Sequence, residues 1–205
     1  MTTAAINFQF TEATHEYTVD GIRVPSVTQI LESAGLVDYR GIPPETLRYA
    51  AERGTAVHLA SVYYDQEDLD PDSLDPQVAK YLAAWRKFRL EHEFQVLESE
   101  QMHLGELNDL QFGMTVDRVV KIDGRLAILD LKCSSKVYDW CGVQTAGYAI
   151  GLGNGTLDAR LAVYRRLVVQ LKPDCTYRLY EYSGPMDGEI FAAALRIAHW
   201  KMGTQ

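Results

Sequence analysis

The spacing of apolar residues changes along the chain from a helical period to a strand period. In the first half, apolar side chains recur every three or four residues, as on one face of an amphipathic helix. This spacing predicts helices over 26–36, 43–64 and 77–93, the first capped by Ser26. A hairpin that turns at Asp20-Gly21 precedes them, because this dipeptide favours two-residue turns. The acidic segment 65–75 is expected to be a loop.

From residue 94 onward the apolar residues alternate with a period of two, which is typical of strands. The predicted strands are 94–104, 110–122, 125–133, 159–171 and 176–182, and further helices are expected over 137–152 and 188–202. The dipeptide Asp123-Gly124 predicts a second hairpin. This order predicts one domain over residues 1–205, of the α/β or α+β class, with a central mixed sheet flanked by helices.

Composition is that of an ordinary globular protein, with one asymmetry of charge. The chain is 47% hydrophobic and 23% charged, and no apolar run approaches the ~18 residues that a membrane span needs. Net charge is −8, yet segment 118–172 has nine Lys or Arg against four Asp or Glu. A basic region on an acidic body suits an enzyme that meets a polyanion, although an ordinary solvated surface explains the charges equally well.

An acid and a base stand two residues apart in the otherwise apolar strand 125–133. Asp130 and Lys132 should therefore point to the same face of the sheet. A turn at 123–124 pairs residues whose numbers sum to about 247, which sets Asp117 opposite Asp130. Cross-strand neighbours lie ~4.5–5.5 Å apart, so the two carboxylates would repel each other unless a cation joined them.

Mg²⁺ is the cation that fits these oxygens, because it accepts two carboxylates together with water and phosphate oxygens. Lys132 could then orient or deprotonate an attacking water, or stabilise charge on a phosphate. The pattern therefore favours phosphodiester hydrolysis. An ordinary Asp–Lys salt bridge remains the alternative for these residues taken alone.

Further motifs connect these residues to a known family. The segment VDR, followed by a hairpin and ILDLKCSS, resembles the core of the PD-(D/E)XK nuclease superfamily, with Asp117, Asp130 and Lys132 at the motif positions. VQTAGYAIGL matches the Q-x-x-x-Y helix of the RecB-like, lambda-exonuclease-like branch through Gln144 and Tyr148. Residue 116, often proline in the superfamily, is valine here.

Two segments nearer the N-terminus extend the resemblance over nearly the whole chain. ERGTAVH resembles the G-x-x-x-H helix of the same branch through Gly54 and His58, and the glycine is expected to let the helix approach the sheet. YTVDGIRVPSVTQIL looks like the opening of phage and bacterial members. Four motifs in the right order are far more specific than any one of them.

The resemblance implies a restriction-endonuclease-like core and a DNA nuclease that depends on Mg²⁺ or Mn²⁺. The implied activity is an exonuclease in DNA recombination, repair or end processing. The implied metal ligands are Asp117, Asp130, His58, the Leu131 carbonyl and Glu100, with Glu98 as the alternative to Glu100. Catalytic roles fall on Asp117, Asp130, Lys132, Gln144 and Tyr148. Ser134, Ser135 and Lys136 follow the catalytic strand as small polar residues do in relatives, and they are expected to contact DNA. Arg48 and Arg53, on the His58 helix, are expected to contact DNA phosphates, although ordinary surface arginines explain them equally well.

Tryptophan and cysteine carry further expectations. Trp85 and Trp140 could stack on bases, but packing in the core is the more ordinary use of both. The three cysteines include no C-x-x-C pair, so we expect reduced thiols in a cytoplasmic protein. Some relatives hold an iron–sulfur cluster with four cysteines, one early in the chain. No cysteine precedes residue 133 here, so no iron–sulfur cluster is expected.

Other functions stay open. A non-catalytic nucleic-acid-binding module on a decayed nuclease fold would not need the intact acids and lysine. An endonuclease or a nuclease acting on RNA is a second possibility. A metabolic enzyme with Lys132 or Cys133 as nucleophile leaves the acids unexplained. The expected partners are DNA and a single-strand annealing or recombination protein, with no membrane, and the oligomeric state stays open.

Overall fold

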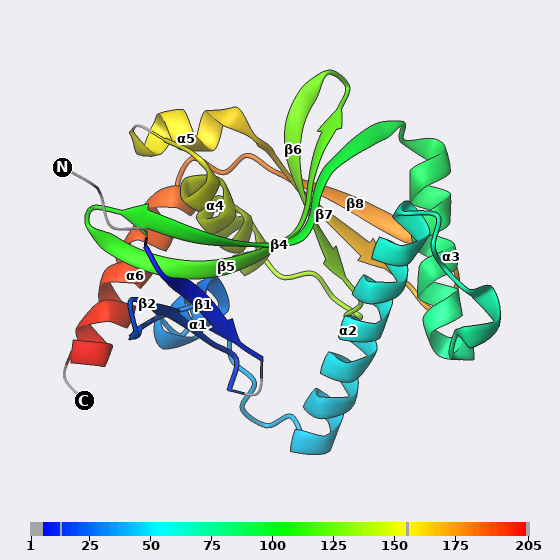
Figure 1. Ribbon diagram of the computed structural model, residues 1–205, viewed down its shortest axis with the longest axis horizontal. Helices are drawn as coiled ribbons and strands as arrows, with labels where there is room; N and C mark the ends of the chain where they lie inside the picture. The colour runs from blue at the N-terminus through cyan, green and yellow to red at the C-terminus, as the bar shows by residue number, and fades with distance from the viewer. Residues whose placement is uncertain (1–5, 13, 155, 204–205) are drawn as a thin grey trace.

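A five-stranded mixed sheet forms the centre of the computed structural model, which describes residues 6–12, 14–154 and 156–203. Its strands, in spatial order, are β4 (Phe94–Leu107), β5 (Leu110–Ile122), β6 (Arg125–Lys132), β7 (Arg165–Leu171) and β8 (Tyr177–Tyr182). Neighbouring strands are antiparallel except β6 and β7, which are parallel. Figure 1 shows β4 and β5 as a long hairpin that extends past the rest of the sheet.

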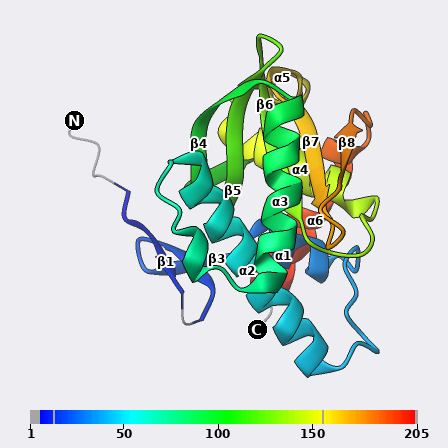
Figure 2. The same ribbon diagram turned by 90° about the vertical axis from the view of Figure 1, so that its right-hand side faces the viewer.

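Helices cover both faces of this sheet, as the sequence predicted. On one face lie α2 (Pro44–Asp65) and α3 (Pro76–Glu91), which run side by side in Figure 2. On the other face lie α1 (Val27–Ser33), α4 (Trp140–Leu152), α5 (Leu157–Val163) and α6 (Asp187–Gly203). Within the part of the chain described, no helix has the length and apolar character needed to cross a membrane.

Two hydrophobic cores lie on opposite sides of the sheet. Successive side chains of β6 point to opposite faces, so this strand contributes to both cores. Ile128 packs in the core that contains α1, α4 and α6, whereas Leu129 and Leu131 pack in the core beneath α2 and α3. The hairpin register has Arg118 opposite Leu129, and residue numbers sum to 247 as predicted. This register brings Asp117 to the level of Asp130.

A small N-terminal sheet packs against the long hairpin. Its strands are β1 (Phe8–Thr11), β2 (Glu16–Val19) and β3 (Ile22–Val24). The contact is close at Gly113, where an added Cβ would lie 2.1 Å from the ring of Tyr17. At the start of α1, the Ser26 side chain accepts from the Gln29 amide and the Gln29 side chain accepts from the Ser26 amide. The predicted Ser26 cap is confirmed.

Two expectations about local structure were wrong. The predicted strand 159–171 begins only at Arg165, and α5 occupies the segment before it, with the Thr156 hydroxyl accepting from the Ala159 amide. Since β6 and β7 are parallel, the chain has to cross back over the sheet, and helices occupy that crossover. The acidic segment 65–75 is not wholly a loop, because α2 ends at Asp65 and a 3₁₀ turn, η1 (Pro71–Ser73), follows.

Candidate metal centre and active site

Three side chains able to bind a metal ion converge from α2, β4 and β5. Nδ1 of His58 lies 3.1 Å from Oε1 of Glu100 and 3.6 Å from Oδ1 of Asp117. Their ligand atoms all lie within 4.8 Å of one another. His58, Glu100 and Asp117 are therefore a group that could hold a metal ion.

The backbone at Glu100 departs from regular strand geometry. The register of β4 against β5 shifts between Val96 and Glu98, and Glu100 has a φ of 48°. This left-handed conformation is unfavourable for a non-glycine residue and costs of order 1–3 kcal/mol. Glu100 reaches His58, whereas Glu98 bonds to Nε2 of His103 at 2.8 Å. Of the two glutamates that the sequence could not separate, the structure places Glu100 in the cluster.

Asp130 and Lys132 form a tight pair next to this cluster. Asp130 is 1% exposed, and Nζ of Lys132 lies 2.9 Å from its Oδ1 and 2.7 Å from its Oδ2. Only the contact to Oδ1 has hydrogen-bond geometry, but Oδ2 is the oxygen closer to the ammonium, so Lys132 pairs with the whole buried carboxylate. A hard cation bound at Asp130 would share this carboxylate with Lys132.

Asp117 and Leu131 connect the cluster to the strand that carries this pair. Oδ2 of Asp117 accepts from the Leu131 amide at 2.7 Å, which leaves Oδ1 toward His58. The Leu131 carbonyl lies 3.1 Å from Nε2 of His58. If Nε2 donates to that carbonyl, Nδ1 carries the free lone pair and faces the two carboxylates, which is the tautomer that a metal ligand needs.

Burial and the charges of the site together shift three pKa values. Burial lowers the pKa of His58, but the carboxylates of Asp117 and Glu100 outweigh burial and raise it to about 9. Burial raises the pKa of Asp130 to about 6, against the opposing effect of Lys132. Burial also lowers the pKa of Lys132, but Asp130 and Asp117 hold it above its ordinary value. Without a metal ion, protonated His58 and Lys132 therefore balance the carboxylates.

The predicted helix pair lies on α4, and both members are buried. Nε2 of Gln144 donates to the Tyr148 hydroxyl at 2.9 Å, and Oε1 of Gln144 is buried with no donor in the described structure. Burial raises the pKa of Tyr148 well above its ordinary value, and the charges of Asp130 and Asp117 add to the effect. Tyr148 is therefore a neutral phenol close to the two acids.

Arg118 is a residue of the site that the sequence reasoning missed. It is fully buried, with its Nη1 2.6 Å from the Asp117 carbonyl and 3.4 Å from Oε1 of Glu100. Its Nη2 donates to the Ser61 hydroxyl at 2.7 Å and its Nε to Oδ2 of Asp65 at 3.1 Å. Arg118 thus ties α2 to β5 and holds Glu100. An arginine inside the apolar run VDRVV was the signal available.

Asp65 completes this network, against the expectation that it belongs to a solvated loop. Its side chain is 3% exposed, and its Oδ1 accepts from Nε1 of Trp85 at 3.0 Å. Trp85 is fully buried, so its expected place in the core is confirmed.

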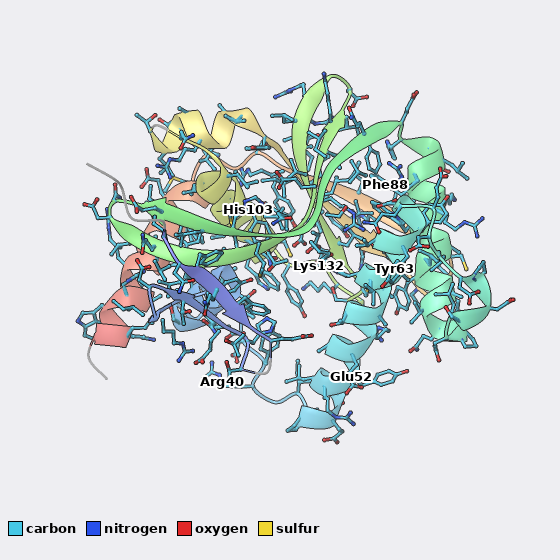
Figure 3. The ribbon with its side chains drawn as sticks, in the orientation of Figure 1. Arg40, Glu52, Tyr63, Phe88, His103 and Lys132 are labelled. Atoms are coloured by element: carbon cyan, nitrogen blue, oxygen red, sulfur yellow. The ribbon has the colours of Figure 1, made fainter. Side chains whose placement is uncertain are left out.

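The residues expected to contact DNA do not all lie together. Arg53, Ser134, Ser135 and Lys136 line one cavity beside Lys132, whereas Arg48 pairs with Glu52 at 2.7 Å on an exposed face of α2. Lys132 itself lies near the middle of the molecule beside α2, and Glu52 lies toward the far end of that helix (Figure 3).

The expectation that Gly54 lets its helix approach the sheet was wrong. A Cβ added there would meet nothing within 4 Å apart from its own helix, so the glycine is not needed for close packing of α2 on the sheet.

Comparison with known proteins supports the fold and leaves the family open. No protein-family model matches the sequence, and no curated protein matches it significantly. A crystal structure of a “Putative exonuclease” from Eubacterium rectale matches with a TM-score of 0.50 at 15% identity, over 86% of this chain and 82% of that one. A crystal structure of SSO0001 matches at 16% identity over 87% and 84% of the two chains, but its TM-score of 0.39 is too low to carry an argument. At 15% identity the first likeness shows the fold alone, a mixed α/β core.

Proposed function

We propose that this protein is a DNA nuclease, an exonuclease that uses Mg²⁺ or Mn²⁺. The observation that carries the proposal is the group formed by His58, Glu100 and Asp117, with the pair of Asp130 and Lys132 beside it. The name of the structural neighbour from Eubacterium rectale, “Putative exonuclease”, agrees with the proposed activity. The sequence motifs extend the proposal to the RecB-like, lambda-exonuclease-like branch.

The ligand set suits a hard divalent cation, because it combines carboxylate oxygens with one imidazole nitrogen. Asp117, Glu100, Asp130 and Nδ1 of His58 would hold the ion, with the Leu131 carbonyl supporting His58. A bound divalent cation would supply an activated water and neutralise charge on the phosphate.

Lys132 acts in this scheme as a cation and hydrogen-bond donor. In the metal-free protein, Asp130 and Asp117 hold its pKa above the ordinary lysine value, so Lys132 is protonated in that state. It would orient the attacking water or stabilise charge on a phosphate oxygen. Gln144 and the neutral phenol of Tyr148 would hold a phosphate oxygen or that water through their polar groups.

The wider setting follows from the motif resemblance. We place the activity in DNA end processing during recombination or repair, in a bacterial or phage-infected cytoplasm, with a single-strand annealing or recombination protein as partner. The free thiols of Cys133, Cys141 and Cys175 agree with a reducing compartment.

Digestion of end-labelled linear DNA and closed circular DNA tests the proposal, with Mg²⁺, Mn²⁺ or EDTA. We expect the wild type to degrade linear DNA with a divalent ion, to spare closed circles and to be inactive in EDTA. Lys132→Ala and Asp117→Asn should each lose at least ~100-fold in rate, as expected for groups that act on the reacting atoms. Lys87→Ala, which removes a half-exposed lysine 3.9 Å from Glu91, is the control and should act like the wild type.

A thermal shift separates metal binding from cleavage. Mn²⁺ at 100 times its dissociation constant should stabilise the wild type by ~2.7 kcal/mol, and Asp117→Asn should abolish this gain. Equal cutting of closed circles would make the protein an endonuclease. DNA binding without degradation under any metal condition would favour the non-catalytic binding module.

A further inference from the structure

A cavity of about 1000 Å³ begins at Lys132 and leads away from the metal centre. One wall is the segment 133–140 that follows β6, and the facing wall is the connection from α1 to α2 with the first turns of α2. Figures 1 and 2 show these turns of α2 projecting beyond the sheet. The volume lies at the upper end of the range for small-molecule pockets, so the cavity has room for a short stretch of polymer.

The charges that line the cavity favour an anion, on a protein whose net charge is −8. Its cations are Arg53, Lys132, Lys136 and Lys172, and its acids are Asp38 and Asp174. Lys132 is already paired with Asp130, and both acids have partners as well. Asp38 bonds to Arg40, which lowers the pKa of that carboxyl to about 2, and Asp174 accepts from the amide and hydroxyl of Thr176.

Two of the cations, Lys136 and Arg53, have groups that could bind a phosphate. Lys136 has no carboxylate within ion-pair distance among the described residues, and its Nζ lies 4.8 Å from the ring centroid of Tyr138. Nε of Arg53 is buried with no acceptor in the described structure, a state that a bound anion would relieve. Cations placed in this way are those that track a nucleic-acid backbone.

Aromatic rings line the same cavity as these cations. Tyr39, Tyr49 and Tyr138 are 43%, 54% and 48% exposed, a large exposure for side chains in one hollow. The rings of Tyr138 and Trp140 are nearly parallel, with an interplanar angle of 10° and centroids 6.3 Å apart. Nζ of Lys132 lies 5.8 Å from the centroid of Trp140, so this pair of rings begins beside the proposed catalytic amine.

We propose that this cavity binds an unpaired, single-stranded end of DNA and delivers it to Lys132. In a duplex the faces of the bases are stacked on one another, so an exposed ring such as Tyr138 can stack on a free base face only where the nucleotides are unpaired. Aromatic platforms interleaved with cations are the usual construction of single-strand binding sites. The inference rests on the proposed nuclease function and adds the strand state of its substrate.

Binding in EDTA tests the cavity without cleavage. The probes are fluorescein-labelled oligodeoxythymidylate and a blunt duplex of equal length, followed by fluorescence anisotropy. We expect the single strand to bind more tightly than the duplex. Tyr138→Ala should weaken single-strand binding ~5- to 100-fold, the fold-change for one stacked base, and Tyr138→Phe should restore it. Trp200→Ala, which removes a 67% exposed ring on α6 outside this cavity, should change nothing.

Salt dependence separates charge from stacking. Lys136→Ala should reduce the slope of log affinity against log salt by about 0.7, the value for one phosphate contact with a single strand, and Tyr138→Ala should leave the slope unchanged. Tighter duplex binding, or single-strand binding that is equal in Tyr138→Ala and the wild type, would overturn the inference.

The two proposals can fail separately. If the protein binds single strands through Tyr138 but never cleaves DNA, the nuclease proposal is refuted and the proposal for the cavity is supported. If Tyr138→Ala and the wild type digest single-stranded DNA at the same metal-dependent rate, the proposal for the cavity is refuted and the nuclease proposal is supported.

Discussion

The buried pair of Arg118 and Asp65 should be one of the strongest supports of the site, and Asp65→Ala measures it. The substitution leaves the guanidinium of Arg118 buried without its main counter-charge, since the two side chains are 0% and 3% exposed. Breaking a buried pair costs ~3–5 kcal/mol. Arg118 keeps its bonds to the Asp117 carbonyl and to Ser61, but Nε1 of Trp85 and the guanidinium of Arg89 also lose Asp65, so we expect a cost of at least ~3 kcal/mol.

Thermal and urea unfolding of the metal-free protein provide the assay. At 2–4 °C per kcal/mol for a chain of this size, the expected fall in melting temperature is ~6–12 °C. The control is Glu52→Ala, which removes the exposed pair with Arg48 and should cost less than ~0.5 kcal/mol. A loss in Asp65→Ala no larger than that of the control would show that water reaches Arg118 and that the network does not hold α2 to β5.

Three further predictions concern protonation, the helix backbone and the thiols. The pKa of His58 is raised to about 9, so its contribution to the stability of the metal-free protein should be complete below pH ~6.5 and lost by pH ~9. Mn²⁺ affinity should rise over the same range, because fewer protons compete for His58. Melting temperatures in EDTA and Mn²⁺ affinities that do not change across this pH range would show that His58 is outside the site. Gly54→Ala should stabilise α2 by up to ~1 kcal/mol in urea unfolding, and a loss of stability would mean that a contact forms at this position. Burial raises the pKa of Cys133 to about 12 and of Cys141 to about 11, so a thiol reagent at pH 8 should label only Cys175 before denaturation, and fast labelling of all three would refute this.

Elements whose signals are local could be predicted from the sequence. The turn at Asp123-Gly124 determines the hairpin register, and this register alone sets Asp117 at the level of Asp130. Alternation of apolar residues along β6 determines that Leu129 and Leu131 share one face, which packs against α2 and α3 in the structure. Both results depend on a period of two and a two-residue turn, which are properties of a few neighbouring residues.

Failures arose where distant segments decide the outcome. Alternating apolar residues suggested a strand from residue 159, but the parallel pairing of β6 with β7 requires a crossover, and α5 is part of it. Asp65 looked like a loop acid because its partners, Arg118 and Trp85, lie 53 and 20 residues away in the chain.

The sequence by itself determined the class of fold, the hairpin and the pair of Asp130 and Lys132 on one strand face, because spacing and turn chemistry act over short ranges. Tertiary structure alone decided that Glu100 rather than Glu98 joins His58. The register shift in β4 and the left-handed backbone conformation of Glu100 together direct its side chain toward His58. Tertiary structure also decided which cations and rings share the cavity beside Lys132, because these come from separate segments of the chain that only packing brings together.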